Sequence, residues 1–293
     1  MRYDRAMFKR QRTGSVICPS CGSLVGVNDD RCYTCGRRNP GLWGLTPLLR
    51  RLGNDLGFTS IVIGGCTLLY LLTLAASGGH IGMSGLITFL APSSQALFIF
   101  GASGALPVFE YGRWWTILSA SWLHGGLLHI LFNMLWVRQL GPATAELYGA
   151  ARLVVIYTVA GATGFLLSSV AGILLPGVPV IGGAQFTIGA SAAIFGLLGA
   201  MVLYGHRTGS HIVKGQAWSW AVTLFVFGLI MPGVDNWAHA GGFAGGYVAA
   251  SLLDPLKPER TDHMLIALGC IVATVASVVA SVVQGVSWLM RIG

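Results

Sequence analysis

A serine and a histidine in two separate apolar segments have the residue types of a hydrolytic pair. Ser191 lies in the segment GASAAIFG, and His239 begins the segment HAGGFAGG. A serine hydroxyl is a weak nucleophile until a base removes its proton, and a neutral imidazole within hydrogen-bond distance is a common base. The two residues therefore predict nucleophilic acyl-transfer chemistry, provided that the fold brings them together.

A second polar pair predicts the donors that such chemistry needs. His129 and Asn133 are four residues apart and share one face of a helix. With the backbone N–H of Ser191, they are candidates for stabilising an oxyanion. Two alternatives remain open: the pair could be a polar contact between membrane helices, and a lone serine such as Ser191 commonly bonds its own i−4 carbonyl.

Small and aromatic neighbours support the catalytic interpretation. Small residues recur at four-residue spacing and let helix backbones approach closely in lipid: Gly242, Gly246 and Ala250 in one run, and Ala192, Gly196 and Ala200 in the other. Gly189, two residues before the serine, is a further supporting residue. Phe195 follows Ser191 by one turn and could pack flat on the His239 imidazole, fixing it without a carboxylate.

Two nearby polar residues receive no catalytic role. Asp235 lies one turn before His239, and we expect it to be a solvated loop residue. His124 is expected at the membrane interface.

Four cysteines near the N-terminus predict a metal site. Cys18, Cys21, Cys32 and Cys35 form two CxxC pairs, each followed directly by a glycine. Four thiolates at this spacing can close a tetrahedral zinc site. A pair of disulfides is the alternative, but disulfides rarely persist in a reducing cytosol. We expect structural Zn²⁺, with no open coordination position for catalysis and folding that depends on the metal.

The composition predicts that most of the chain lies in lipid. Of 293 residues, 54% are hydrophobic and 10% are charged, whereas soluble domains have about 25% charged residues. The mean hydropathy is +0.70. Seven runs approach the length of a membrane helix, about 20 residues: 58–77, 116–138, 152–175, 186–205, 216–232, 236–253 and 264–286.

The charge distribution predicts the orientation. Ten of the 18 Lys and Arg residues lie within residues 1–51 with only three aspartates, so this segment carries +7 of the net charge of +8. Positive charge beside the first apolar span marks the cytoplasmic side, so we interpret it as an orientation signal and expect no nucleic-acid partner. We expect a multi-pass protein of the bacterial inner membrane, with a cytoplasmic N-terminus and no cleaved signal peptide.

This orientation places the polar residues at one depth. The second, fourth and sixth runs then cross from outside to inside. His129, Ser191 and His239 each lie early in one of them, so one water-filled cavity in the outer half of the bilayer could contain all three. The outer connection 78–115 is expected in the interface, with Trp114 and Trp115 at headgroup depth.

Three motifs in this order resemble the rhomboid family of intramembrane serine proteases: YGRWWTILSASWLHGGLLHILFNM, GASAAIFG and AHAGGFAGG. The resemblance covers roughly residues 55–255. It implies an all-α polytopic membrane protein with a six-helix rhomboid core, a Ser191–His239 dyad, and an oxyanion pocket that includes His129 and Asn133. Its implied substrates are membrane proteins cut in or near a transmembrane segment, without a metal for the chemistry.

Two positions depart from the family pattern. The family often has GxSG and a Trp-Arg pair in the first outer loop, whereas here Ala192 follows the serine and Thr116 follows Trp115. Arg113 could replace the displaced arginine. The last run is similar to the seventh helix that some rhomboids add to the core.

We expect three parts along the chain. They are a basic cytosolic head over residues 1–51 with a zinc-ribbon-like module at about 16–40, a protease core over 52–255, and a linker with the extra helix over 256–293. The expected partners are membrane-protein substrates, the lipid bilayer and a protein that contacts the zinc module. The alternative function is a non-catalytic rhomboid-like client-binding protein, although such relatives typically lack the serine or the histidine. Inverted repeats or paired broken helices would favour a channel or transporter, and we find no such internal repeat in the sequence.

Overall fold

The computed structural model describes residues 10–46, 52–83, 85, 88–178 and 182–292. Within these ranges the seven predicted membrane runs correspond to seven long helices. They are α2 (Phe58–Ala76), α5 (Leu127–Tyr148), α6 (Ala150–Leu174), α7 (Ser191–Thr208), α8 (His211–Ile230), α9 (Asn236–Leu252) and α10 (Thr261–Ile292). The predicted all-α polytopic fold is confirmed.

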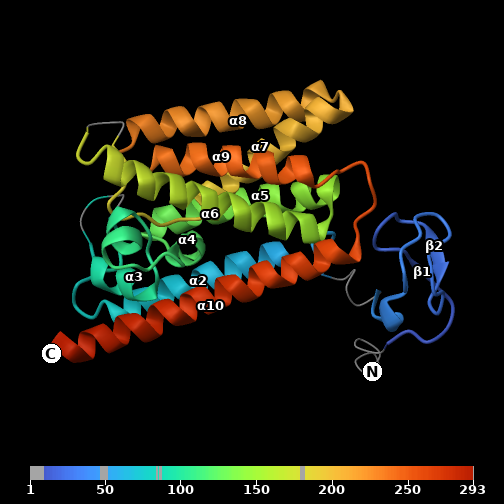
Figure 1. Cartoon of the computed structure of the whole chain (residues 1–293), viewed down its shortest axis with the longest axis horizontal. Coiled ribbons are helices and arrows are strands. Elements are labelled where there is room, and N and C mark those ends of the chain that lie inside the picture. The colour runs from blue at the N-terminus through green and yellow to red at the C-terminus, as the bar shows by residue number, and fades with distance from the viewer. Residues whose placement is uncertain (1–9, 47–51, 84, 86–87, 179–181, 293) are drawn as a thin grey trace.

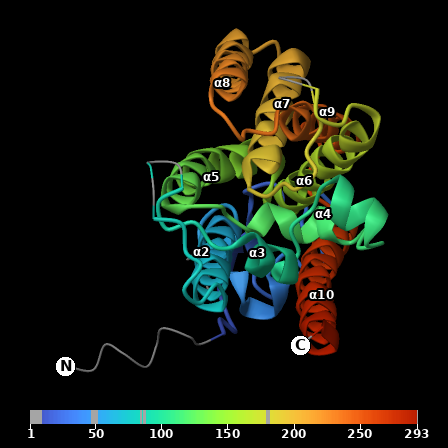
Figure 2. The same cartoon turned by 90° about the vertical axis from the view of Figure 1, so that its left-hand side faces the viewer.

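The long helices lie side by side, and a small N-terminal module lies beyond one end of them (Figure 1). Helices α5, α7 and α9 end at the module side, whereas α2, α6, α8 and α10 begin there. Seen along the helices, α7 lies among α5, α6, α8 and α9, while α2 and α10 pack on another side of the bundle (Figure 2). The starts of α5, α7 and α9 therefore meet at the end of the bundle opposite the module.

The helices divide into two groups by their suitability for lipid. In the described part of the chain, α2, α6, α8 and residues 261–287 of α10 are long and apolar enough to cross a membrane. Helix α5 contains Arg138 and Glu146, α7 ends in His206 and Arg207, and α9 has only 17 residues, many of them Gly and Ala. These three helices carry His129, Ser191 and His239, so the polar chemistry is built on the helices least suited to facing lipid.

The second predicted run, 116–138, is not one helix. It begins with two short turns, α4 (Thr116–Ser119) and η3 (Ala120–Trp122), and the chain is then extended at Leu123. Gly126 has φ 164° and ψ 167°, far from helical values. Two consecutive glycines favour this break because glycine loses the most conformational freedom in a helix, and α5 starts only at Leu127.

The fourth predicted run, 186–205, also starts later than expected. The chain before Ser191 is irregular, and Gly189 has φ 127°. This left-handed region is accessible to glycine but strained for other residues. Ser191 is therefore the first residue of α7 rather than an interior one.

The long outer connection is folded rather than flat. It contains α3 (Ser94–Phe100) and the π-helical turn η2 (Leu106–Glu110). Trp114 is 66% exposed, in keeping with the predicted interfacial position. Trp115 is instead half-buried, and its indole N–H donates to Ser281 of α10.

The N-terminal module is a small hairpin with two knuckle turns. Strands β1 (Ser15–Ile17) and β2 (Leu24–Gly26) pair antiparallel, and the short helix η1 (Leu42–Gly44) follows. Its buried cluster consists of Val16, Val25 and Val27 beside the cysteines. Such a small apolar core agrees with an expected dependence on metal.

The joint between module and bundle is polar. Ser20 donates to the carbonyl of Glu259 at 2.8 Å, and Arg37 donates to the Ser20 hydroxyl and to Met264 Sδ. Arg152, in the first turn of α6, is only 2% exposed, and its guanidinium donates to the carbonyls of Tyr148, Lys257 and Pro258. Arg152 thus fixes the linker that precedes α10.

Candidate active site

Helices α7 and α9 are in backbone contact through their small residues. A Cβ on Gly242 would overlap the backbone of Ala192, and a Cβ on Gly246 would overlap that of Gly196. The predicted close approach is observed, and it requires glycine at both positions on α9. It brings the first turn of α7 beside the first turns of α9.

Ser191 lies at the start of α7, half-buried, beneath the irregular segment that precedes it. The first N–H groups of a helix have no intrahelical acceptor, and the helix dipole is positive at this end. The backbone N–H of Ser191 is therefore available to donate a hydrogen bond to an anion that lies next to the Ser191 hydroxyl. The expected run 186–205 would have placed Ser191 inside a helix, where this donor is consumed.

His239 is 6% exposed and packs on Phe195. The two ring centroids are 4.2 Å apart with an interplanar angle of 18°, which is the flat stacking predicted from the one-turn spacing after Ser191. Within the described residues no hydrogen bond joins the imidazole to the Ser191 hydroxyl or to a carboxylate. The contact that orients the His239 ring in this structure is therefore the stack on Phe195.

Asp235 is not a free loop residue. Its carboxylate accepts from the backbone N–H of Ala238 and from the Ser168 hydroxyl, so it caps α9 and ties this helix to α6. An N-terminal carboxylate also suits the helix dipole. Asp235 therefore fixes the start of the helix that carries His239.

The hydrogen bonds of His129 define its tautomer. The backbone N–H of Gly125 donates to His129 Nδ1 at 3.2 Å, so a neutral imidazole carries its proton on Nε2. This nitrogen lies only 2.7 Å from where a Cβ on Gly189 would stand, and that Cβ would be 3.8 Å from Ser191 Oγ. A larger residue at position 189 would collide with the His129 ring, so glycine lets the chain pass beside it. The region beside Gly189 therefore lies next to both His129 Nε2 and the Ser191 hydroxyl.

Gly125 had no predicted role. The only sequence signal for it is the pair of glycines before His129, which marks a break in the helix. No spacing rule indicates that its N–H points back at the imidazole four residues later. This contact comes from the extended backbone at 123–126.

Asn133 and His124 are both buried beside His129. The Asn133 amide donates to the His129 carbonyl at 2.8 Å, which leaves its second N–H for another acceptor. His124 is fully buried, with its ring 5.1 Å from that of His129 in an edge-on arrangement. The expectation of an interfacial His124 is wrong, because the chain turns inward at Leu123 instead of continuing a helix.

The segment before Ser191 pairs with the outer connection. Ser103 and Thr187 exchange two backbone hydrogen bonds of 3.0 and 2.8 Å, and the N–H of Gly189 donates to Ala120 at 2.9 Å. A short extended pairing thus holds the residues that lead into the serine.

The four cysteines of the module converge as predicted. All four sulfurs lie within 4.8 Å of one another, with 3.8 Å between those of Cys18 and Cys35 and 3.6 Å between those of Cys21 and Cys32. Tetrahedral Zn–S bonds of about 2.3 Å place sulfurs about 3.8 Å apart. The thiols are free rather than joined in disulfides, so the cluster fits one zinc ion.

Both cysteine pairs sit on matching turns. Gly22 donates to the carbonyl of Cys18, and Gly36 donates to that of Cys32. Their φ angles are 75° and 73°, a conformation that glycine adopts without strain. In the second turn the backbone N–H of Cys35 lowers the pKa of the Cys32 thiol to about 6. Burial raises the pKa of the Cys35 thiol to about 12. Metal binding needs thiolates, and the N–H groups of the second turn stabilise the thiolate of Cys32.

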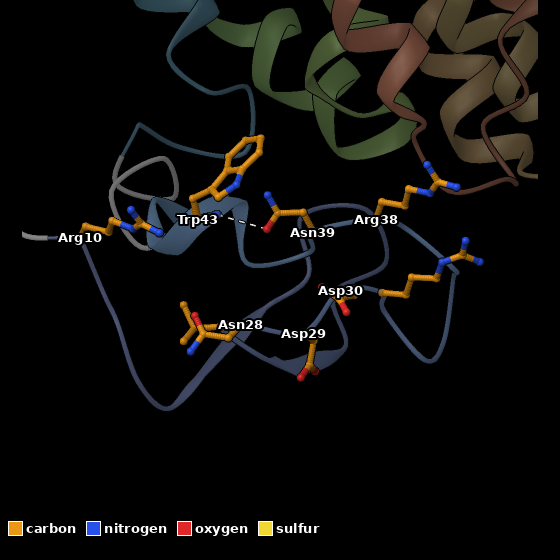
Figure 3. Close-up of a pocket in the computed structure, with 9 residues that line it drawn as sticks. Arg10, Asn28, Asp29, Asp30, Arg38, Asn39 and Trp43 are labelled. Atoms are coloured by element: carbon orange, nitrogen blue, oxygen red, sulfur yellow. Dashed lines mark hydrogen bonds between the residues drawn. The ribbon is translucent and has the colours of Figure 1, made fainter.

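The module also carries a surface cavity of about 420 Å³ (Figure 3). Its lining mixes Arg10, Arg31 and Arg38 with Asp29 and Asp30. Neither the cysteines nor the Ser191–His239 region lines it. The cavity is therefore separate from both sites.

Comparison with known proteins agrees with this geometry. Residues 111–255 match the model of the Rhomboid domain. The chain is 33% identical over 168 residues to RHOMBOID-like protein 4 of Arabidopsis thaliana, covering 56% of this chain and 40% of that protein. It is 30% identical over 184 residues to Rhomboid protease GluP of Bacillus subtilis (strain 168), covering 62% of this chain and 34% of that protein.

The chain thus contains a segment, residues 111–255, that is similar to the Rhomboid domain, and it is an integral membrane protein. The matched domain begins in the outer connection and ends after α9, so it contains His129, Ser191 and His239, whereas the cysteine module and α10 lie outside it. The chain spans between about a third and a half of the length of the first curated relatives that it matches.

Proposed function

We propose that this protein is an intramembrane serine endopeptidase that cleaves membrane proteins in or near a transmembrane segment. The observation that carries the proposal is the meeting of the α7 and α9 helix starts. There Phe195 stacks on His239 one turn after Ser191, and Nε2 of His129 adjoins the space beside Gly189. The printed name of the Bacillus subtilis relative, a rhomboid protease, supports the same class of reaction.

In the proposed mechanism, Ser191 Oγ attacks the scissile carbonyl while His239 removes its proton. The resulting oxyanion lies in the space beside Gly189. It accepts hydrogen bonds from His129 Nε2, the Ser191 N–H and the second N–H of Asn133. His239 then gives its proton to the leaving amine, and water attacks the acyl-enzyme by the same route in reverse, releasing the new carboxylate and Ser191.

The cysteine module would hold Zn²⁺ as a structural ion through Cys18, Cys21, Cys32 and Cys35. Four thiolates fill a tetrahedral zinc, so this site supplies stability to the module and takes no part in the cleavage. The basic N-terminal region supports a cytosolic position for the module and a position of the Ser191 site toward the outer leaflet.

The test compares alanine variants of two helical serines in liposomes that contain a single-span substrate. Ser191→Ala should lower cleavage by about 10⁴-fold or more. Ser169→Ala is the matched control, because the Ser169 hydroxyl only bonds the i−4 carbonyl of Phe165. A fluorophosphonate should label the parent and the control but not Ser191→Ala.

Two outcomes would overturn the proposal. One is equal cleavage by the parent and by Ser191→Ala. The other is a parent that cuts none of a panel of single-span proteins and is not labelled, while still retaining them on a column. That second result would favour a client-binding protein.

A further inference from the structure

Helix α10 lies outside the matched Rhomboid domain and yet contacts the part of the chain that leads to the serine. Much of its surface is apolar and exposed, as expected for contact with lipid. The exposed residues include Leu265, Ile266, Leu268, Val272, Val275, Val279 and Val283. A different face carries Ser277, Ser281 and Gly285, which are buried against the outer connection.

The buried face of α10 is bound by hydrogen bonds to residues 113–115. The Ser277 hydroxyl donates to the carbonyl of Trp115 at 2.7 Å, and the Trp115 indole donates to the Ser281 hydroxyl at 3.1 Å. The Arg113 guanidinium donates to the Ser281 carbonyl at 2.9 Å. Three bonds thus join two residues of the helix to two residues of the loop, where water is excluded and an unmade bond is costly.

Arg113 is the centre of this contact. It is 2% exposed, it also donates to the carbonyl of Phe98, and its guanidinium lies 4.3 Å from the centre of the Phe98 ring. A buried arginine without a carboxylate partner needs such carbonyl and aromatic contacts to be tolerated. One of the acceptors that bind the Arg113 guanidinium, the Ser281 carbonyl, belongs to α10.

The chain that follows this loop contacts the residues just before Ser191. Residues 116–122 follow directly, and the Ala120 carbonyl accepts from the N–H of Gly189. Ser119 donates to the Gly101 carbonyl, and Ser103 pairs with Thr187 just before Gly189. The residues that bind Ser281 and the residue that binds Gly189 therefore belong to one short segment, residues 113–120.

We propose that α10 is a positioning helix for the Ser191 site, in which Ser277 and Ser281 anchor Trp115 and Arg113 and thereby hold Gly189 at the oxyanion space. The expected effect on the cleavage rate rests on the proposed peptidase function, whereas the expected effect on the position of Gly189 does not. Ser277 and Ser281 touch neither substrate nor reacting atoms, and act through the loop.

The test is a double-mutant cycle between helix and loop in full-length protein. Ser281→Ala and Trp115→Phe each remove one side of the same hydrogen bond. Each should lower the rate of Ser191 labelling by a fluorophosphonate, and kcat, by about three- to tenfold with little change in KM. The double variant should be no slower than the worse single variant, because the two changes remove one interaction.

Ser287→Ala is the matched control on α10, since Ser287 donates only to Gln284 of its own helix. It should leave both rates unchanged. Rates are corrected for the folded fraction from thermal unfolding. The proposal is overturned if Ser281→Ala equals this control after the correction, or if the cycle is additive.

Hydrogen exchange separates this proposal from the proposed function. The Gly189 amide should exchange faster in Ser281→Ala than in Ser287→Ala, whether or not the protein is a peptidase. If the parent is not labelled but this amide is deprotected, the peptidase proposal fails and the anchor stands. If the parent is labelled and the amide is unaffected, the anchor fails alone.

Discussion

The cysteine module and the Ser191 region bring their functional side chains together in different ways. The module brings four sulfurs within 4.8 Å using residues from Cys18 to Cys35 and two short turns. The Ser191 region draws on residues from Gly125 to His239, which belong to three long helices and two irregular segments. The module is built from neighbouring residues and has only a small apolar core, so it depends on a metal for stability. The Ser191 region is built from distant residues and depends on close packing of its helices.

Removing a metal ligand is the largest expected break on the module side. In Cys32→Ser the module should lose its zinc and unfold, since structural zinc contributes about 10–16 kcal/mol in isolated fingers. Metal analysis and limited proteolysis of residues 10–46 would measure both effects. Fluorophosphonate labelling of Ser191 should change by less than about twofold, because the bundle has its own packed core.

Cys270→Ser provides the control, because this half-buried thiol lies in α10 away from the cluster. It should retain one zinc per chain. Full zinc content in Cys32→Ser would contradict a four-cysteine site.

The converse break separates α9 from α7. A side chain in Gly246→Val would overlap the backbone of Gly196, and overpacking of this kind costs about 1–3 kcal/mol or more. Displacing His239 from Ser191 by about 1 Å should lower labelling by about 100-fold. Zinc content should be unaffected.

Gly269→Val on α10 is the matched substitution, because a Cβ there would meet no atom within 4 Å. Labelling of this variant should equal that of the parent. An equal loss in both variants would show that helix flexibility, rather than the α7–α9 contact, determines the rate.

The smallest predicted effect concerns the joint between the two regions. Burial raises the pKa of Glu259, although the N–H and the guanidinium of Arg152 oppose the shift. A carboxyl whose folded pKa is raised binds more protons in the folded state, so its contribution to stability is complete below the ordinary value of about 4.3. That contribution falls as the pH rises through the raised pKa.

In Glu259→Gln this part of the pH dependence should disappear, with a change in stability below about 1 kcal/mol. The thermal midpoint of the parent should decline as the pH rises from about 4, and that of the variant should stay level over the same window. Asp262→Asn, which removes an exposed carboxylate paired with Arg260, is the control. A parent midpoint that rises across the window would contradict the shift.

The sequence predicted which residues would converge in each region but not all of their contacts. The seven long helices follow from apolar runs, and the Phe195–His239 stack follows from a one-turn spacing on a helix whose partner was inferred from small residues. The positions of Gly125 and Trp115 could not be predicted, since their contacts depend on irregular backbone at 123–126 and on the docking of α10. The missed buried state of His124 has the same origin.

The sequence alone determined the features that depend on local spacing and composition. These are the cysteine cluster, whose turns need glycine just after each pair, and the division of the chain into lipid-suited helices. The tertiary structure decided the rest. It placed Ser191 at a helix start, fixed the His129 tautomer through Gly125, and packed the last helix against the loop that leads toward Ser191. Such features depend on where distant backbone groups come to lie, and no periodicity in the sequence records them.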